Sequence, residues 1–119
     1  MEKPMCANRI YAPIHDIRWS GAEKLAARNA FKNAYGRECK AVLAELKKMI
    51  ATASAPSDLW KIHDYLSEQR NQTDEKYDYR YSVLVFVFAK LLNEGWLQEN
   101  ELKGIGEEKM EQIRTAASL

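Results

Sequence analysis

Glycine and proline are scarce in this chain, whose 119 residues include only five glycines and three prolines. So few turn-forming residues favour long regular elements, and a chain of this length suits one domain better than two. Hydrophobic residues make up 46% and charged residues 29% of the sequence. That composition is typical of a folded globular protein and excludes a disordered one.

Neither sign of charge dominates, because 18 basic and 17 acidic residues leave a net charge of +1. Such a balance produces little field to attract a polyanion, which argues against general nucleic-acid binding. Cys6 and Cys39 are too few for a disulfide framework or a zinc site, so we expect a reducing cytoplasm. His15 and His63 lack the spacing of metal ligands, which argues against a metal centre.

Long apolar runs are also missing. The longest, VLVFVFA at residues 83–89, is far shorter than the roughly 20 residues that span a bilayer. The first residues lack the apolar core of a signal peptide. We therefore expect a soluble, cytoplasmic protein without a transmembrane segment.

One long helix is predicted from Trp19 to about residue 53. Ser20 suits the N-cap position, with Glu23 three residues later in a capping-box arrangement. Beyond them, apolar residues recur at steps of three and four and form one stripe: Phe31, Tyr35, Cys39, Val42, Leu46 and Met49. Residues 1–18 contain two prolines and no sustained period, so we expect a flexible N-terminal extension.

A second helix is predicted from Asp58 to Tyr77, after Pro56 and with Ser57 as its N-cap. Two long helices joined by a short connection normally lie antiparallel, so residues 19–77 should form a hairpin. The hairpin alone has too little surface to cover both apolar stripes. Either later segments or a second chain must complete the core.

The apolar segment 83–88 suits either a buried strand or a helix in isolation. The run continues without a turn to Gly95, which suits the position after a helix C-terminus, and Asp78 suits an N-cap at the other end. No other clear strand is present to pair with it. We therefore predict a helix of about sixteen residues, apolar over most of its circumference.

The remaining residues are expected to complete a helical head over residues 78–119. Trp96 should begin a short helical turn, residues 103–106 should break it, and a final helix should run to about Ser118. We therefore predict a single all-α domain over residues 19–119.

The second predicted helix carries an unusual set of polar side chains beside its apolar face. With residues about 100° apart, one arc of the helix gathers Trp60, His63, Asp64 and Arg70. This arc is either a solvated flank or a docking surface, since Trp and Arg are enriched at protein–protein hot spots. Adjacent residues diverge on a helix, so His63 and Asp64 should not form a catalytic relay. We expect no enzymatic activity.

The sequence LKGIGEEKMEQI at residues 102–113 is similar to the hairpin of helix-hairpin-helix modules, in which backbone N–H groups bind a phosphate. Glu107 and Glu108 would repel a phosphate at the start of the following helix. Such a nucleic-acid-binding module is one alternative function for the chain. A dimeric helical adaptor that only joins other proteins is another.

Two stretches of the sequence resemble the fluorescence recovery protein family of cyanobacteria. They are DLWKIHDYLSEQR at residues 58–70 and EKYDYRYSVLVFVFAKLLNEG at residues 75–95. WSGAEKLAARNAFKNAYGREC at residues 19–39 is similar to that family's first helix. The resemblance implies an elongated all-α homodimer with a long antiparallel hairpin and a small C-terminal head.

The resemblance also implies a non-enzymatic regulator of photoprotection. Such a protein binds the C-terminal domain of the light-activated red form of the orange carotenoid protein. It accelerates reversion to the orange form and detachment from the phycobilisome, which ends non-photochemical quenching and restores antenna fluorescence. The carotenoid belongs to the partner, so no cofactor is expected here. A cytoplasmic location is implied, with peripheral association with the thylakoid membrane left open.

By the same resemblance, Trp60, His63, Asp64 and Arg70 are the residues expected at the partner-binding surface or dimer edge. Phe86 matches a partner-contacting position in the head. For the dimer seam we expect the apolar face of the second helix, formed by Leu59, Ile62 and Leu66.

Overall fold

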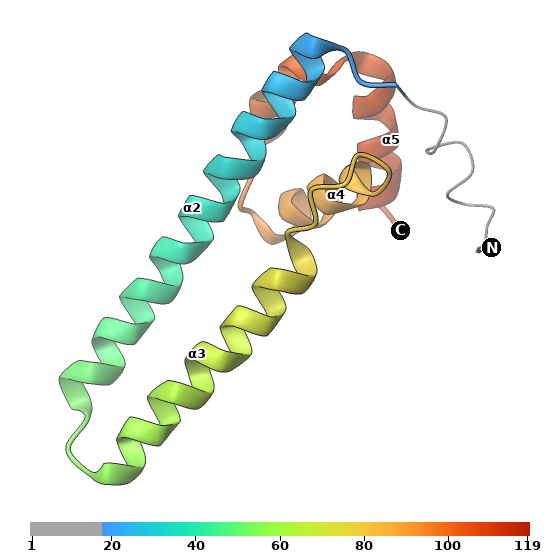
Figure 1. The fold of residues 1–119 in the computed structure, drawn as a ribbon. Helices are drawn as coiled ribbons and strands as arrows, with labels where there is room; N and C mark the ends of the chain where they lie inside the picture. The colour runs from blue at the N-terminus through green and yellow to red at the C-terminus, as the bar shows by residue number, and fades with distance from the viewer. Residues whose placement is uncertain (1–17) are drawn as a thin grey trace.

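The computed structural model describes residues 18–119, and every regular element in that range is helical. The elements are α2 (Gly21–Thr52), α3 (Pro56–Lys76), α4 (Leu84–Glu94), the 3-10 helix η1 (Glu99–Ile105) and α5 (Glu107–Ala117). Helices α2 and α3 form a long antiparallel hairpin, and the other three form a head at one end (Figure 1). The predicted all-α architecture is confirmed. The extension predicted over residues 1–18 lies almost wholly outside the described residues, as do Cys6 and His15.

Helix α2 begins where the capping residues predict. The backbone N–H of Glu23 donates to the Ser20 hydroxyl at 3.1 Å, and the Ser20 N–H donates to the Glu23 carboxylate at 2.8 Å. These reciprocal bonds satisfy backbone donors that have no partner inside the helix. The helix then runs for 32 residues to Thr52, in agreement with the predicted boundary.

The predicted N-cap of the second helix is wrong by two residues. Helix α3 begins at Pro56, after Ala55 in an extended conformation, so Ser57 lies inside the first turn. Proline favours the first helical position because its φ is already fixed near the helical value. The carboxylate of Asp58 accepts the backbone N–H groups of Ser54 at 3.0 Å and Ala55 at 2.9 Å, and thereby closes this end of the helix.

The start of the third helix is also corrected, because α4 begins at Leu84 and Asp78 does not cap it. Aromatic packing explains the delay: Phe31 of α2 lies 4.8 Å from Tyr79, measured between ring centroids, and Trp19 lies 5.4 Å from Tyr81. Both tyrosine rings pack against the start of α2, which holds residues 77–82 outside a helix. At the other end Gly95 has φ 86°, as predicted for a residue that ends a helix.

The final segment contains the predicted break, but it falls later than expected. Helix η1 continues through Ile105, and the chain changes direction at Gly106, where φ is 98°. Gly106 is the N-cap residue of α5, which begins at Glu107. The backbone at Gly104 also lies very close to α2, since a Cβ atom there would be 2.7 Å from the Ala26 Cβ atom.

The hydrophobic core lies in the head and not in the hairpin. Small buried residues of α2 allow η1 to approach closely: Ala27, Ala30 and Ala34. The largest fully buried side chains all belong to the head: Leu84, Phe88, Leu91, Leu102, Ile105 and Ile113. Helix α3, by contrast, has no buried residue. The half of the hairpin farther from the head therefore leaves apolar side chains exposed, which requires a functional explanation.

Candidate functional site

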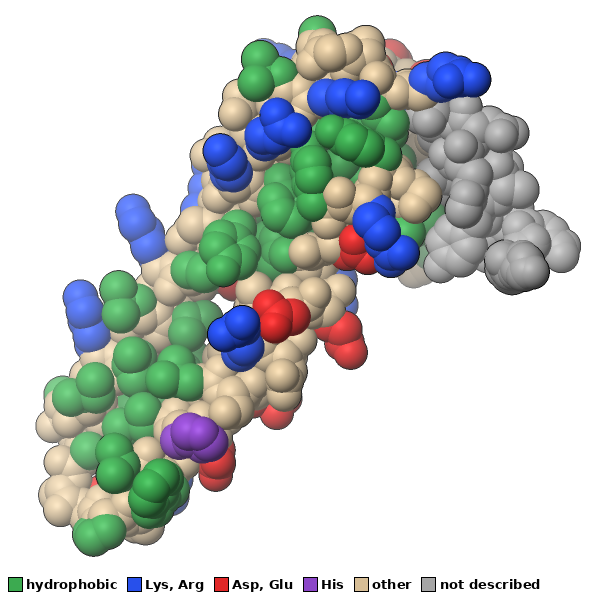
Figure 2. All heavy atoms as spheres, in the orientation of Figure 1, with side chains coloured by type: hydrophobic (Ala, Val, Ile, Leu, Met, Phe, Trp, Pro, Cys, Tyr) green, Lys and Arg blue, Asp and Glu red, His purple; other side chains and the backbone are tan. Residues whose placement is uncertain are grey.

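The end of the hairpin carries an exposed apolar surface, formed by Leu59, Trp60, Ile62 and Leu66 and called here the tip surface. Leu59 is 59% exposed, Trp60 is 62% exposed and Leu66 is 37% exposed. Figure 2 shows hydrophobic side chains gathered over this part of the hairpin. A contiguous apolar surface on a small protein usually marks an interaction site.

Three of the four residues predicted on the polar arc lie together. The rings of Trp60 and His63 are 6.5 Å apart between centroids, in an edge-on arrangement. The His63 Nδ1 atom lies 3.5 Å from the Asp64 carboxylate, which corrects the expectation that these adjacent side chains diverge. Their flexible side chains lean toward one another, but both are mostly exposed and 3.5 Å is at the limit of a hydrogen bond. This contact suits orientation of a surface and not proton transfer.

Arg70 lies apart from the other three residues and pairs with Asp74. Its Nε atom is 3.1 Å from the Asp74 carboxylate, four residues later on α3. Arg70 and Asp74 also border a shallow groove between α2 and α3, where Tyr35, Cys39 and Leu66 complete much of the lining. The sequence prediction did not include Asp74, although the spacing of four residues is the usual signal for such a pair.

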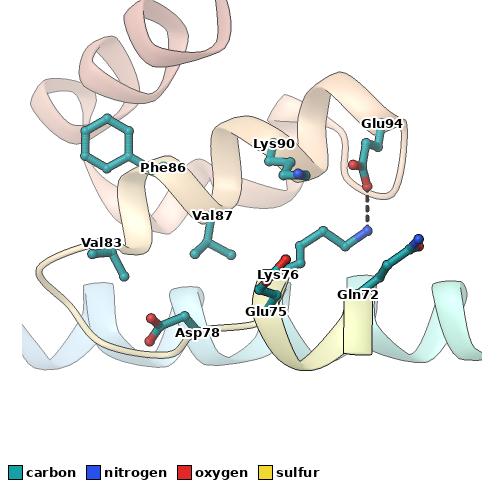
Figure 3. Close-up of a pocket in the computed structure, with 9 residues that line it drawn as sticks. All are labelled: Gln72, Glu75, Lys76, Asp78, Val83, Phe86, Val87, Lys90 and Glu94. Atoms are coloured by element: carbon teal, nitrogen blue, oxygen red, sulfur yellow. Dashed lines mark hydrogen bonds and ion pairs between the residues drawn. The ribbon is translucent and has the colours of Figure 1, made fainter. Parts of the chain in front are cut away.

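A second groove separates the end of α3 from α4 and is called here the head groove. It has a volume of about 370 Å³, and its lining includes Gln72, Lys76, Val83, Phe86, Val87 and Lys90. Figure 3 shows Val87 facing the end of α3, with Lys76 directed toward Glu94. The head groove thus combines an apolar wall with charged rims. It places Phe86, expected to contact a partner, beside a hollow large enough to admit side chains of another protein.

Lys76 joins three helices at the base of the head groove. Its ammonium group lies 2.6 Å from the carboxylate of Glu38 on α2 and 2.6 Å from that of Glu94 on α4. The Tyr77 hydroxyl donates to the other oxygen of Glu38 at 2.8 Å. Burial alone would lower the pKa of Lys76, but the two carboxylates outweigh it and raise that pKa. Sequence reasoning missed this cluster, because nothing local relates residues 38, 76 and 94.

Two further ion pairs fasten the head to α2. Lys109 is buried, lies 3.0 Å from the Glu23 carboxylate and sits over the Trp19 ring, 5.2 Å from its centroid. Arg37 lies 2.8 Å from Glu101 and also donates to a backbone carbonyl of the head. The backbone N–H of Ser20, followed by the Lys109 ammonium, holds the pKa of Glu23 below its usual value. These contacts give the head a fixed orientation on the hairpin.

Within residues 18–119, the carboxylate, imidazole and thiol groups form no cluster of three that could hold a metal ion. In the same range, every helix is too short or too polar to cross a membrane. The glycine turn before α5 is followed by acidic residues, and Glu107 pairs with Arg114 at 2.9 Å. The described chain is therefore a helical scaffold that presents an apolar tip surface and a head groove with an apolar wall and charged rims. This arrangement suits the binding of other proteins.

Comparison with known proteins identifies the class of this module. The family described as "Photoprotection regulator fluorescence recovery protein" matches residues 19–117. The chain is 43% identical over 101 residues to the fluorescence recovery protein of Synechocystis sp. (strain ATCC 27184 / PCC 6803 / Kazusa), over 85% of this chain and 93% of that protein. The chain therefore belongs to the fluorescence recovery protein family of photoprotection regulators, which is not a known class of enzyme.

Solved structures support the same assignment. The Fremyella diplosiphon fluorescence recovery protein is 41% identical and superposes with a TM-score of 0.80, covering 86% of this chain and 100% of that chain. The Synechocystis sp. PCC 6803 fluorescence recovery protein is 42% identical, with the same TM-score and the same coverage of both chains. The hairpin with its helical head is thus an architecture shared with solved structures of this family.

Proposed function

We propose that this chain binds the light-activated red form of the orange carotenoid protein and accelerates its reversion to the orange form. Binding is directed at the C-terminal domain of that protein. It promotes detachment from the phycobilisome, so that non-photochemical quenching ends and antenna fluorescence returns. The observation that carries this proposal is that a chain of a photoprotection regulator family presents an exposed apolar tip surface and a head groove beside Phe86 on one scaffold.

To accelerate the reversion of its partner from the red to the orange form, the regulator must meet one physical requirement. The regulator must bind the transition state of the return more tightly than the red state, as a catalyst does. A scaffold that contacts two separated domains of its partner can do so by raising their effective concentration. The described residues extend over 54 Å in their greatest dimension, and ion pairs fix the head on the hairpin. Surfaces bound at the two ends are therefore held at a set distance.

In this proposal the head groove receives the partner beside Phe86. The apolar wall supplies contact area, and the charged rims fix the orientation of the bound surface. At the tip surface, Trp60 serves as a rigid apolar anchor, and the neighbouring His63 and Asp64 orient its edge. Farther along α3, beside the groove between α2 and α3, Arg70 serves as a charge-assisted clamp. The carotenoid remains with the partner, so the chain itself needs no cofactor.

We further propose that a second copy of the chain covers the seam formed by Leu59, Ile62 and Leu66. Leu59 is 59% exposed, and Ile62 lies three residues along the same face. The four-residue and three-residue steps between these side chains make one continuous apolar strip, as in helix pairs that associate in water. The resulting homodimer would act in the cytoplasm, close to the thylakoid membrane that carries the antenna.

The decisive experiment mixes the protein with photoactivated carotenoid protein in the dark and follows the decay of red absorbance. We expect a substoichiometric amount of this chain to accelerate the decay. An unchanged decay at equimolar concentration would contradict the proposed function. Addition of phycobilisomes then measures whether fluorescence recovers at the same rate.

A further inference from the structure

The net charge of +1 conceals an uneven distribution of charge. Helix α2 contains seven basic and three acidic residues, which gives it a net charge of +4. The other described residues contain nine basic and twelve acidic residues, which gives them −3. The positive electrostatic potential is therefore concentrated along α2, although the net charge of the chain is small. It can act on a partner that approaches this helix.

Four exposed cations of α2 form a row called here the basic stripe: Arg28, Lys32, Lys40 and Lys47. At about 100° per residue, this row lies on the side of α2 opposite the buried alanines that pack against the head. Figure 2 shows lysine and arginine side chains along this outer edge. Within residues 18–119 none of the four forms an ion pair. Two of the three glutamates of α2 are already engaged, Glu23 by Lys109 and Glu38 by Lys76.

Gly36 lies in the middle of the basic stripe, four residues from Lys32 and four from Lys40. A Cβ atom at Gly36 would meet no atom of the described chain within 4 Å, so packing within the chain does not require glycine there. A glycine inside a helix is also destabilising relative to alanine. The missing side chain at Gly36 therefore leaves a gap in the stripe that packing within the chain does not explain. Such a gap would let another protein approach the helix backbone closely.

Two exposed leucines lie along the same side of the helix. Leu25 is 59% exposed and Leu43 is 48% exposed, and at about 100° per residue each falls between Arg28 and Lys40 around the helix. They stand 18 residues apart, or about 27 Å along a helix. Leucines so widely separated do not make the continuous apolar face that inserts into a bilayer. A nucleic acid would use the charges but neither the leucines nor the gap.

We propose that the basic stripe with its Gly36 gap is a docking surface for an acidic helical face of a protein partner. Carboxylates spaced about one turn and then two turns apart on a partner helix would match Arg28, Lys32 and Lys40. The partner helix would cross at Gly36, between Lys32 and Lys40, and contact Leu43. This inference rests on the proposed function, because it assigns the stripe to the partner that the chain regulates. Long-range attraction of this kind mainly speeds encounter and weakens with salt.

The test compares two double variants that change net charge equally. Lys32→Glu/Lys40→Glu reverses the stripe, whereas Lys48→Glu/Lys103→Glu reverses two exposed cations outside it. We expect the stripe variant to associate with the photoactivated carotenoid protein about tenfold more slowly at low salt, and the difference to vanish at high salt. Circular dichroism and thermal unfolding confirm that both variants fold. Equal association rates for the two variants would overturn the inference and leave the proposed function intact.

Gly36→Gln provides a second, independent test. It should raise the thermal midpoint, because glutamine favours a helix over glycine. It should nevertheless slow association, because its side chain fills the gap. A variant that is more stable and docks at the wild-type rate would contradict the role of the gap.

A probe that does not depend on the proposed function separates the two hypotheses. If the wild type fails to bind the carotenoid protein, the proposed function fails, and the stripe is then tested with polyglutamate. Low-salt binding of polyglutamate that is lost in Lys32→Glu/Lys40→Glu supports an acidic protein partner, and no binding overturns it. Stripe-dependent binding that is tighter to duplex DNA or to anionic phosphatidylglycerol vesicles would also overturn it, since the occupant would then not be a protein.

Discussion

The ammonium group of Lys76 lies 2.6 Å from the carboxylate of Glu38, and this contact joins the end of α3 to the middle of α2. The Lys76 side chain is only 9% exposed, and the same ammonium group lies 2.6 Å from Glu94 at the end of α4. One cation thus fixes the hairpin and the head relative to each other. The segment that connects α3 to α4 is otherwise held mainly by its tyrosine rings.

Glu38→Gln is therefore expected to destabilise the fold by about 2 kcal/mol. The amide keeps the size of the side chain but leaves a poorly solvated ammonium with one carboxylate in place of two. Urea unfolding followed by circular dichroism measures the change. A double-mutant cycle with Lys76→Met should give a coupling energy of about 1 kcal/mol or more. Additive effects of the two substitutions would show that the contact contributes nothing of its own.

Asp58, and not Ser57, should close the start of α3. Asp58→Ala removes the acceptor of two backbone N–H groups, so we expect a thermal midpoint lower by about 5 °C. The Ser54 and Ala55 N–H groups hold the pKa of Asp58 below its usual value, so its contribution is present at neutral pH. The contribution is lost as pH falls through that lowered pKa. The difference between variant and wild type should therefore shrink in acid.

Ser57→Ala is the matched control, because it removes a hydroxyl one residue away. It should leave the midpoint nearly unchanged. If both variants lowered the thermal midpoint equally, Ser57 would contribute as much as Asp58 to the start of α3, and the prediction would be wrong.

Local signals in the sequence predicted most of the fold. The capping box at Ser20, the break at Pro56 and the turn at Gly95 depend only on neighbouring residues, and each was placed correctly. The starts of α3 and α4 were misplaced for different reasons. At the start of α3 the preference of proline for the first helical position prevails over the preference of serine for the N-cap. At Asp78 the decisive contacts come from Phe31 and Trp19, far away in the chain.

The candidate site was predicted less completely than the fold. Periodicity gathers Trp60, His63 and Asp64 on one side of a helix, and the structure shows them together. The Lys76 cluster and the head groove arise from residues on three separate elements, so no spacing in the sequence indicates them. The basic stripe was not predicted because the sequence analysis considered only the net charge of the chain. A net charge does not show how the basic and acidic residues are distributed.

The stability of the protein should decline between pH 10 and 12. Burial raises the pKa of Tyr79 to about 12, and burial together with Glu38 raises that of Tyr77. In the unfolded chain both phenols ionise near their ordinary pKa of about 10. The contribution of each is therefore complete below about pH 10 and is lost as pH rises toward the raised pKa. Urea unfolding at pH 9, 10.5 and 11.5 measures the decline.

Tyr79→Phe should flatten this alkaline decline, because the phenylalanine ring keeps the aromatic packing but has no ionisable group. Absorbance near 295 nm provides a direct check, since at least one tyrosine of the folded wild type should titrate at about pH 12. A decline of equal steepness in wild type and Tyr79→Phe would contradict the assignment.

Leu59→Glu should weaken association of the chain with a second copy. Leu59 is 59% exposed, so the substitution is tolerated in an isolated chain, whereas a dimer seam would have to bury the new carboxylate. Light scattering at micromolar concentration should report a smaller mass than for the wild type. Leu119→Glu is the control, because Leu119 is 89% exposed at the far end of the head. Equal masses for Leu59→Glu and wild type would exclude Leu59 from the seam.

Arg70→Lys should slow the dark reversion of the photoactivated carotenoid protein that this chain is proposed to accelerate. The planar guanidinium of Arg70 donates its Nε–H group to Asp74. Its remaining N–H groups can bind a partner carboxylate through two parallel hydrogen bonds, which a lysine ammonium cannot do. We expect a loss of about tenfold in acceleration, with unchanged folding and unchanged mass in solution. Arg80→Lys is the control, since Arg80 is an exposed arginine outside α3 that is also paired with an aspartate, Asp78, although through more hydrogen bonds than Arg70 makes with Asp74. A dimeric Arg70→Lys protein with full acceleration would refute the clamp. Equal losses in both variants would also contradict the clamp, because both substitutions keep the positive charge and the loss would then not be specific to Arg70.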